Sequence, residues 1–238
     1  MFDMHTHILF GVDDGCRSLS ESIEMIKKAI VSGVTDLVLT PHFSAKRRYV
    51  VSKEELKEKF NILQEELINQ NLSINLYLGN EIDEHSSVID EIRNNVPLTL
   101  NNTKYVLIDF GMHKSYIDDV IYELKVSGVK TIVAHPERYN YIDYDMIKSW
   151  KKTGALIQLN AGSLFGNKDV KKIAKQLIKR GLVDIVASDA HRNPDSFEYL
   201  RKAYEYVSAK VSKTYADIIF TFNPEQLKGQ EFNQSFIK

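Results

Sequence analysis

One local pattern recurs along the chain and limits the folds open to it. An amphipathic segment ends at a glycine, and a short apolar run with polar residues at its end follows, as in VSGVTDLVLTPH (31–42), VSGVKTIVAHPE (126–137), KKTGALIQLNAGS (151–163) and KRGLVDIVASDAH (179–191). Glycine is favoured at the end of a helix, where the backbone turns left-handed. Runs of Val, Ile and Leu on both faces are typical of buried parallel strands. The repeat therefore predicts alternating helices and parallel strands.

The positions of these runs predict the order of the elements. We expect strands near residues 2–8, 35–40, 73–79, 104–109, 130–135, 155–160 and 183–188. Capping-box spacing in Ser18 with Glu21 and in Ser52 with Glu55 predicts the starts of two helices. Further helices are expected near 84–94, 115–127, 143–153, 168–180, 195–209 and 212–220.

This alternation, without a linker rich in Pro, Gly or Ser, predicts one α/β domain over residues 1–238. A closed or nearly closed barrel is favoured over a doubly wound open sheet, because no glycine-rich phosphate loop follows the first strand. We expect a loosely packed tail from about residue 223.

Composition narrows the class of partner. Lys and Arg number 31 against 32 Asp and Glu, so the net charge of −1 gives no reason to expect nucleic acid or an anionic membrane. Cys16 is the only cysteine, which excludes an intramolecular disulfide and favours a reducing compartment. The sequence shows neither a secretory signal nor a membrane-spanning stretch. We therefore expect a soluble cytoplasmic protein.

Two of the seven histidines stand one residue apart in the first strand, FDMHTHIL (2–9). Side chains alternate along a strand, so His5 and His7 should lie on the same face. Two imidazoles so placed can hold one metal ion. The alternative is a pair of hydrogen-bonded histidines without a ligand.

Polar residues gather where the predicted strands end, which in a β/α barrel is the edge that carries the chemistry. These residues are His5, His7, Asp13, Asp14, His42, Glu81, Asp83, Glu84, His85, Asp109, His135, Glu137, Arg138, Asn160, Asp189 and His191. Buried carboxylates and imidazoles are costly unless paired or metal-bound, so the pattern predicts a metal centre. Nitrogen and oxygen ligands without thiolate favour Mn²⁺, Zn²⁺ or Fe²⁺, and their number favours two or three ions.

Several motifs together resemble one known superfamily. DMHTHILFGVDDG (3–15), LNNTKYVLIDF (100–110), IVAHPERYN (132–140) and ASDAH (187–191) are similar to the polymerase-and-histidinol-phosphatase (PHP) superfamily. Within it, they resemble the manganese-dependent protein-tyrosine phosphatases of Gram-positive capsule operons, from residue 1 to about 220. The resemblance implies a distorted (β/α)₇ TIM-like barrel with a trinuclear site that takes Mn²⁺, with Zn²⁺, Fe²⁺ or Mg²⁺ as alternatives.

The resemblance also implies a ligand set. By motif, it assigns His5, His7, Glu81 and Asp189 to one ion, Glu81, Asp109 and His135 to a second, and Asp14, His42 and His191 to a third. Close relatives often have Glu where this chain has Asp109, which reaches less far. Arg138 matches an arginine used near the substrate phosphate, and Arg192 lies in the loop for a second one.

By the same resemblance, the protein would hydrolyse phosphotyrosine with metal-activated water. Its partner would be the phosphorylated tail of a bacterial tyrosine autokinase that regulates capsule or exopolysaccharide assembly. One alternative is a small-molecule phosphoesterase of the histidinol-phosphatase type, which shares the ligand set. Another is a PHP module that binds metal without turnover.

Two further features call for an interpretation. Cys16 is not expected to be a nucleophile, because residue 22 is Ser rather than Arg and no phosphate loop surrounds the cysteine.

The basic residues Lys46, Arg47 and Arg48 are expected to form a solvated surface loop. The alternative is a rim that attracts an acidic or phosphorylated tail. His85 and His113 are expected to be ordinary surface histidines.

Overall fold

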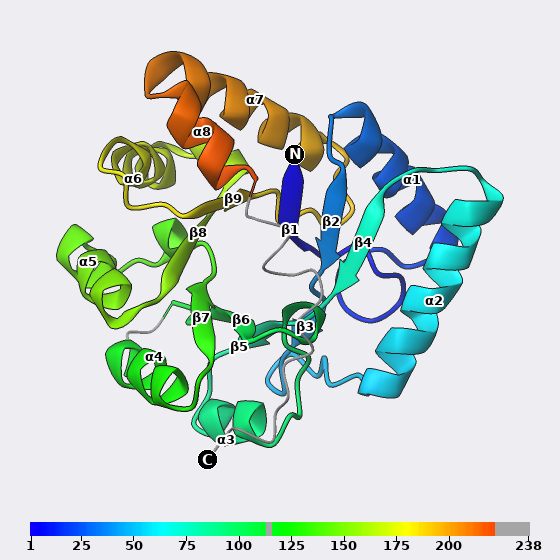
Figure 1. Ribbon diagram of the computed structural model, residues 1–238, viewed down its shortest axis with the longest axis horizontal. Coiled ribbons are helices and arrows are strands. Elements are labelled where there is room, and N and C mark those ends of the chain that lie inside the picture. Colours follow the sequence, from blue (N-terminus) through cyan, green and yellow to red (C-terminus); the bar gives the residue numbers. More distant parts are fainter. Residues whose placement is uncertain (113–115, 222–238) are drawn as a thin grey trace.

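The computed structural model describes residues 1–112 and 116–221, which form a ring of strands surrounded by helices (Figure 1). The expected tail from about residue 223, and His113, lie outside the described residues. The strands are β1 (Phe2–Thr6), β2 (Asp36–Leu39), β3 (His42–Phe43), β4 (Asn75–Leu78), β5 (Glu81–Asp83), β6 (Tyr105–Asp109), β7 (Lys130–Val133), β8 (Leu156–Asn160) and β9 (Ile185–Ala187). The helices are α1 (Leu19–Val31), α2 (Lys53–Asn69), α3 (Val88–Arg93), α4 (Ile117–Val126), α5 (Tyr144–Thr153), α6 (Lys168–Lys179), α7 (Asp195–Lys210) and α8 (Lys213–Ile219).

The nine strand segments of the described residues occupy seven positions in the ring, because two strands are interrupted. β2 pairs with β4, and β3 pairs with β5. β3 follows β2 after a short break, and β5 follows β4 in the same way, so β2 with β3 and β4 with β5 each form one interrupted strand. Every pairing is parallel, and β5 to β9 follow in chain order. A bridge between Thr6 and Ala190 joins the last position to β1. The predicted barrel of seven β/α units is therefore confirmed.

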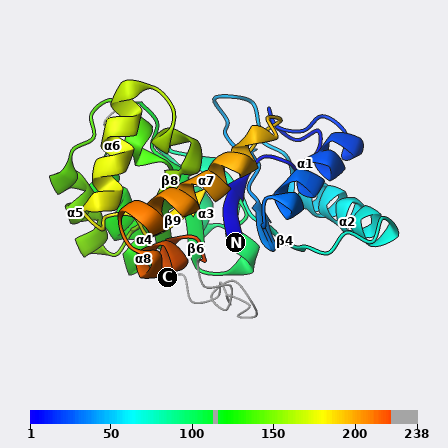
Figure 2. The same cartoon turned by 90° about the horizontal axis from the view of Figure 1, so that it is seen from above.

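Local signals explain where the helices begin and end. The hydroxyl of Ser18 accepts a hydrogen bond from the Glu21 amide, and that of Ser52 accepts one from the Glu55 amide, as the capping boxes predict. Gly154 ends α5 with a φ of 117°, a conformation that residues with a Cβ rarely adopt. The helices then cover the outside of the ring, with α1 and α2 at one end of the molecule and α5 and α6 at the other (Figure 2).

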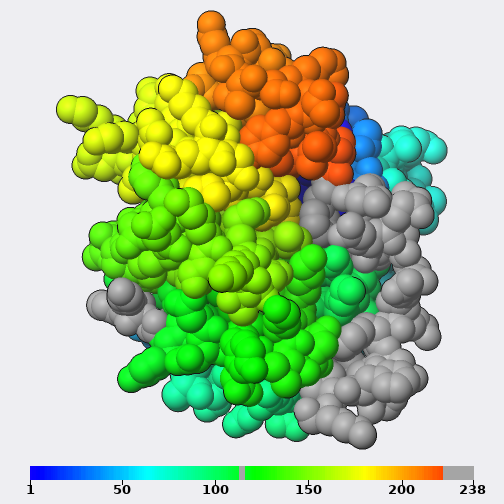
Figure 3. All heavy atoms as spheres, turned by 60° about the vertical axis from the view of Figure 1, so that its left-hand side comes forward, coloured from blue at the N-terminus to red at the C-terminus, as the bar shows by residue number. Residues whose placement is uncertain are grey.

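The core has two layers. A larger apolar cluster lies between strands and helices and includes Leu37, Ile157, Trp150 and Phe197. A smaller cluster fills the inside of the ring with side chains from six strands: Phe2, Met4, Val38, Tyr77, Tyr105, Leu107, Ile132, Ile185 and Ala187. Segments 117–219 form one continuous outer surface (Figure 3). Because apolar side chains fill both layers of the core, the polar residues of the strands gather at the end of the ring where the strands finish.

The first strand contacts the end of the last described helix. The Phe2 amide donates a hydrogen bond of 3.0 Å to the Phe220 carbonyl oxygen just after α8.

None of the helices in residues 1–112 and 116–221 combines the length and apolarity needed to cross a membrane.

β1 contains an irregularity that the sequence did not predict. Relative to β2, β1 carries an extra residue, since Asp3 lies opposite Leu37 and Thr6 lies opposite Leu39. Side chains therefore do not alternate strictly along β1. His5 and His7 still meet, with their Nε2 atoms 3.0 Å apart.

The loop after β1 depends on a glycine. A Cβ at Gly15 would lie 1.6 Å from the His7 carbonyl oxygen, and backbone rather than a flexible side chain blocks it. We expect Gly15→Ala to lower the free energy of unfolding by about 3 kcal/mol, the upper end for overpacking, and the melting temperature by roughly 6–12 °C. Thermal unfolding followed by circular dichroism measures this change.

Gly162→Ala is the matched control, because a Cβ there meets nothing within 4 Å and no left-handed φ is involved. An equal loss of stability in both variants would contradict the close approach at Gly15.

Candidate metal centre

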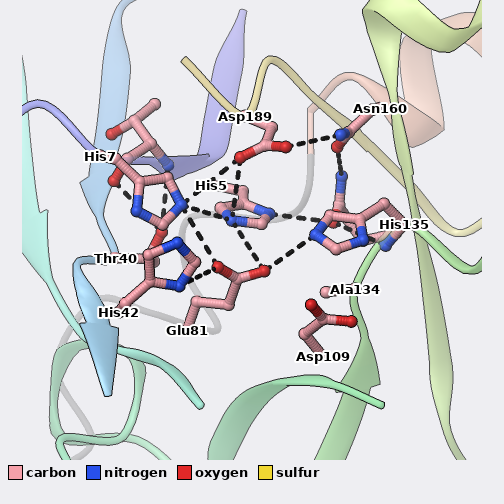
Figure 4. Close-up of polar contacts among 12 residues, drawn as sticks. His5, His7, Thr40, His42, Glu81, Asp109, Ala134, His135, Asn160 and Asp189 are labelled. Carbon is pink, nitrogen blue, oxygen red and sulfur yellow. Dashed lines mark hydrogen bonds and ion pairs between the residues drawn. The ribbon is translucent and has the colours of Figure 1, made fainter. Parts of the chain in front are cut away.

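A buried carboxylate lies at the centre of the polar rim. Glu81, at the start of β5, is 1% exposed and is surrounded by imidazoles (Figure 4). Its Oε1 lies 2.9 Å from His135 Nε2 and 3.4 Å from His5 Nε2. Its Oε2 lies 2.8 Å from His42 Nδ1 and 3.4 Å from His7 Nε2. Segments far apart in the sequence thus converge on one acidic group.

Three sets of side chains around Glu81 have ligand atoms close enough to share an ion. Within each set these atoms lie within 4.8 Å of one another. The sets are His5, His7 and Glu81; Glu81, Asp109 and His135; and His7, Asp14, His42 and His191. They correspond to the three groups expected from the sequence, except that the first lacks Asp189 and the third gains His7. The structure brings these predicted ligands together, and their role as ligands stays a prediction.

Asp189 lies beside the first of these sets, and Asp14 belongs to the third. Asp189 Oδ1 is 3.5 Å from His5 Nε2 and 3.4 Å from His7 Nε2. Asp14 Oδ1 lies 3.5 Å from His42 Nε2 and 3.4 Å from His191 Nε2. Both carboxylates therefore lie where the sequence places them.

Opposite charges stabilise each other in this cluster. Burial alone would raise the pKa of Glu81, but His5 and the hydrogen bonds from His135 and His42 hold that pKa well below its ordinary value. Burial lowers the pKa of His135, yet the Glu81 carboxylate outweighs it and raises this pKa to about 9. The same balance lowers the pKa of Asp189, where the positive charge of His5 and His7 overcomes burial. The carboxylates thus favour positive charge at this rim.

A chain of side-chain amides fixes the orientation of His5. The Asn160 amide donates to Asp189 Oδ2 at 2.7 Å, so the Asn160 oxygen must accept from Gln158 Nε2 at 2.9 Å. Gln158 Oε1 accepts from the His135 backbone amide at 3.2 Å and faces His5 Nδ1 at 3.1 Å. His5 therefore keeps a proton on Nδ1, so Nε2 is the nitrogen that a neutral His5 offers to an ion.

His7 is held in the same form by a different partner. Asp13 Oδ2 lies 2.8 Å from His7 Nδ1 and accepts its proton, so Nε2 is the nitrogen that a neutral His7 offers to an ion. The Nε2 atoms of His5 and His7 face each other at 3.0 Å beside two carboxylates. This donor set fits a divalent cation, and hydrogen bonds that set the histidine tautomer are typical of metal sites.

Backbone strain marks two of the predicted ligands. His135 has a φ of 32° and Asp189 a φ of 53°, both in the left-handed region that non-glycine residues rarely enter. Such strain gathers at functional sites, where the surrounding structure holds it in place. The hydrogen bond from the Asp189 amide to the His5 carbonyl oxygen, 2.9 Å long, is one such restraint.

A cavity of about 420 Å³ opens beside this cluster. Its lining includes His135 and Asp109 from the predicted ligands, together with Arg138, Phe110 and Tyr139. Arg138 Nη1 lies 3.1 Å from Asp189 Oδ2, so this arginine reaches the cluster as predicted. Its part in binding phosphate stays a prediction.

Arg192 and Cys16 lie elsewhere. Both line a separate hollow beside α1, with Glu21 and Lys28 among its other residues. The role of Arg192 near phosphate stays a prediction. Burial raises the pKa of the Cys16 thiol to about 12, which is unsuited to a nucleophile.

The structure gives a role to Gln158, which the sequence analysis did not single out, and to Asp13 and Glu137, which it named only among the polar residues at the strand ends. Gln158 and Asp13 orient histidines, and Gln158 could have been found because it precedes Asn160 by two positions and so shares its face of β8. Glu137 is buried and accepts hydrogen bonds from the Asn160 backbone amide and the Ser163 hydroxyl.

The basic loop and His85 lie at the margin of the site. The basic loop is exposed, as expected, yet Arg47 also contacts His42 and Asp109. His85 lies 3.2 Å from Glu91 and is not part of the three sets.

Comparison with known proteins places this arrangement in a family. The profile described as "Capsular polysaccharide synthesis, CpsB/CapC" matches residues 1–228. The putative tyrosine-protein phosphatase CapC of Staphylococcus aureus is 38% identical over 197 residues, covering 80% of this chain and 77% of its own. The tyrosine-protein phosphatase YwqE of Bacillus subtilis is 30% identical, covering 95% and 91%.

Solved structures agree. A chain from the structures of YwqE from Bacillus subtilis and CpsB from Streptococcus pneumoniae, described as unique metal-dependent tyrosine phosphatases, superposes with a TM-score of 0.87 at 30% identity, covering 95% of this chain and 94% of that one. Histidinol phosphate phosphatase from Lactococcus lactis, at 14% identity and a TM-score of 0.55 over 84% of this chain and 92% of its own, shares the fold. The chain therefore belongs to the CpsB/CapC family of capsular polysaccharide synthesis.

Proposed function

We propose that the protein is a metal-dependent protein-tyrosine phosphatase. The observation that carries the proposal is the convergence of three overlapping ligand sets on Glu81, next to a cavity that contains Arg138. The tyrosine-phosphatase names of similar chains support the same activity.

The residues around Glu81 would hold two or three divalent ions, with Mn²⁺ as the proposed metal. When bound, such ions neutralise phosphate oxygens and lower the pKa of a coordinated water toward neutrality. Nitrogen and oxygen donors without thiolate suit this class of ion. Glu81 belongs to two sets and His7 to two, so these side chains would set the spacing between neighbouring ions.

The remaining side chains bind and orient the substrate. Arg138 can donate two parallel hydrogen bonds to phosphate oxygens, and these strengthen as charge develops on them. Phe110 and Tyr139 line the same cavity and offer apolar surface to a phenol ring. Because a phenolate with a pKa near 10 is a better leaving group than an alkoxide, phosphotyrosine is favoured over phosphoserine.

We propose as the physiological substrate the phosphorylated tail of a bacterial tyrosine autokinase that regulates capsule or exopolysaccharide assembly. The family description and the names of the relatives support a link to capsule synthesis. We place this reaction in the cytoplasm, where the single reduced cysteine fits.

His5→Ala tests the metal centre. Removal of one imidazole from the shared set should lower kcat/KM for a phosphotyrosine peptide by at least about 100-fold, because even outer partners of metal ligands cost 10–100-fold. Bound Mn²⁺ should also fall, as measured by elemental analysis of dialysed protein. The circular dichroism spectrum should stay that of the wild type.

His85→Ala is the matched control for metal content, since His85 lies outside the three ligand sets and contacts Glu91 and the Ser87 amide, although it lines the cavity. Equal activity and equal metal content in His5→Ala and wild type would contradict the assignment.

Substrate preference separates the proposal from a small-molecule phosphoesterase. With Mn²⁺ present, we expect kcat/KM for a phosphotyrosine peptide to exceed that for histidinol phosphate by at least about tenfold, a difference of about 1.4 kcal/mol in transition-state binding. The reverse preference would favour the histidinol-phosphatase alternative. Absence of hydrolysis with any phosphoester would favour a non-catalytic module.

Gln158→Met tests the amide chain. It removes the acceptor for His5 Nδ1 and for the His135 amide while keeping the volume close. We expect the Mn²⁺ affinity, measured by titration calorimetry, to fall by about 10–100-fold.

Thr131→Val is its control, since the Thr131 hydroxyl is buried on the neighbouring strand and has no hydrogen-bond partner in the described residues. A similar loss of Mn²⁺ affinity in this variant would show a general effect of core changes.

A further inference from the structure

We propose that Arg47 is a second phosphate-binding arginine, which lines the same cavity as Arg138. The inference rests on the proposed function and names a residue that recognises the substrate. It assigns to the basic loop a role that the sequence alone did not favour.

A tight turn brings Arg47 to the cavity. Ser44 and Tyr49 exchange two backbone hydrogen bonds of 2.9 Å, and the Arg47 amide donates to the Ser44 hydroxyl at 3.2 Å. The Tyr49 ring stacks on the His42 imidazole with centroids 5.8 Å apart. The turn is therefore packed against a predicted metal ligand rather than extended into solvent.

Acidic and imidazole groups orient the guanidinium. Arg47 Nε lies 3.3 Å from Asp83 Oδ2, and Asp83 in turn accepts a hydrogen bond of 2.6 Å from the Ser44 hydroxyl. Arg47 Nη1 donates to His42 Nε2 at 3.0 Å, and Nη2 lies 3.9 Å from Asp109 Oδ2. The guanidinium thus lies between two of the predicted ligand sets.

Arg47 remains reachable for a ligand in that position. Its side chain is 43% exposed, and it lines the same cavity as Arg138, His135 and Asp109. Two guanidinium groups at one cavity can neutralise a phosphate dianion and fix its orientation through directed hydrogen bonds. Arg192 lies in a different hollow, so among these arginines Arg47 and Arg138 share the cavity.

The neighbours of Arg47 provide a contrast within one tripeptide. Lys46 lines the cavity but makes no ion pair within the described residues, so nothing holds its ammonium group toward the metal ligands. Arg48 adopts a φ of 63° and is absent from the cavity lining. Arg47 is the member of the tripeptide with a fixed orientation.

Phosphate binding to the Mn²⁺-loaded protein tests the inference. We expect Arg47→Ala to weaken binding of inorganic phosphate, measured by titration calorimetry, by about tenfold or more, since a hydrogen bond to a charged group contributes about 1.5–3 kcal/mol. The KM for p-nitrophenyl phosphate should rise in parallel. Arg47→Lys should restore only part of the affinity, because ammonium lacks the planar fork.

Arg48→Ala is the matched control and should stay within about twofold of wild type, because an exposed charge outside the cavity contributes little. Unchanged phosphate affinity in Arg47→Ala would overturn the inference. So would a change confined to the amount of Mn²⁺ bound, since Arg47 would then act on His42 alone. A wild type that binds phosphate through Arg47 but hydrolyses no aryl phosphate would overturn the proposed function and leave the inference standing.

Discussion

A buried negative charge at Glu81 is the constraint on which the rest of the site depends. An isolated ionised carboxylate at 1% exposure would be strongly destabilising, so it persists only with compensating groups around it. Four imidazoles from three parts of the chain supply that compensation. Two of these imidazoles, His7 and His5, have their other ring nitrogen held, and this extends the network to Asp13 and Gln158. One buried charge thus dictates a network across the barrel end.

The breaks in two strands serve this network. β3 begins at His42 and β5 begins at Glu81, and these residues are register partners in a parallel pair. Pro41 lacks an amide hydrogen and so favours an interruption between β2 and β3. The polar rim is therefore a consequence of where the ladder stops and restarts.

The sequence predicts the repeating features well and the non-repeating ones poorly. Helix caps at Ser18 and Ser52 depend on local spacing, and the ligands lie at strand ends whose direction the parallel order fixes. The extra residue in β1 and the position of Arg47 depend on contacts between distant segments, which no local pattern encodes. Arg192 shows how far neighbours in the sequence can separate in space, and its role near phosphate stays a prediction. Its neighbour His191 points to the cluster, whereas Arg192 itself lines another hollow.

The strained residues show how stability and function are linked here. Left-handed backbone at His135 and Asp189 costs roughly 1–3 kcal/mol per residue, and Pro136 disfavours that conformation for His135 further. Both residues persist because hydrogen bonds hold their backbone amides, to Gln158 for His135 and to the His5 carbonyl oxygen for Asp189. The residue that fixes the His5 tautomer therefore also holds the His135 backbone. A change at Gln158 should release strain and disorder the ligands together, which makes the amide chain, rather than any single ligand, the element that keeps the rim ready for its ions.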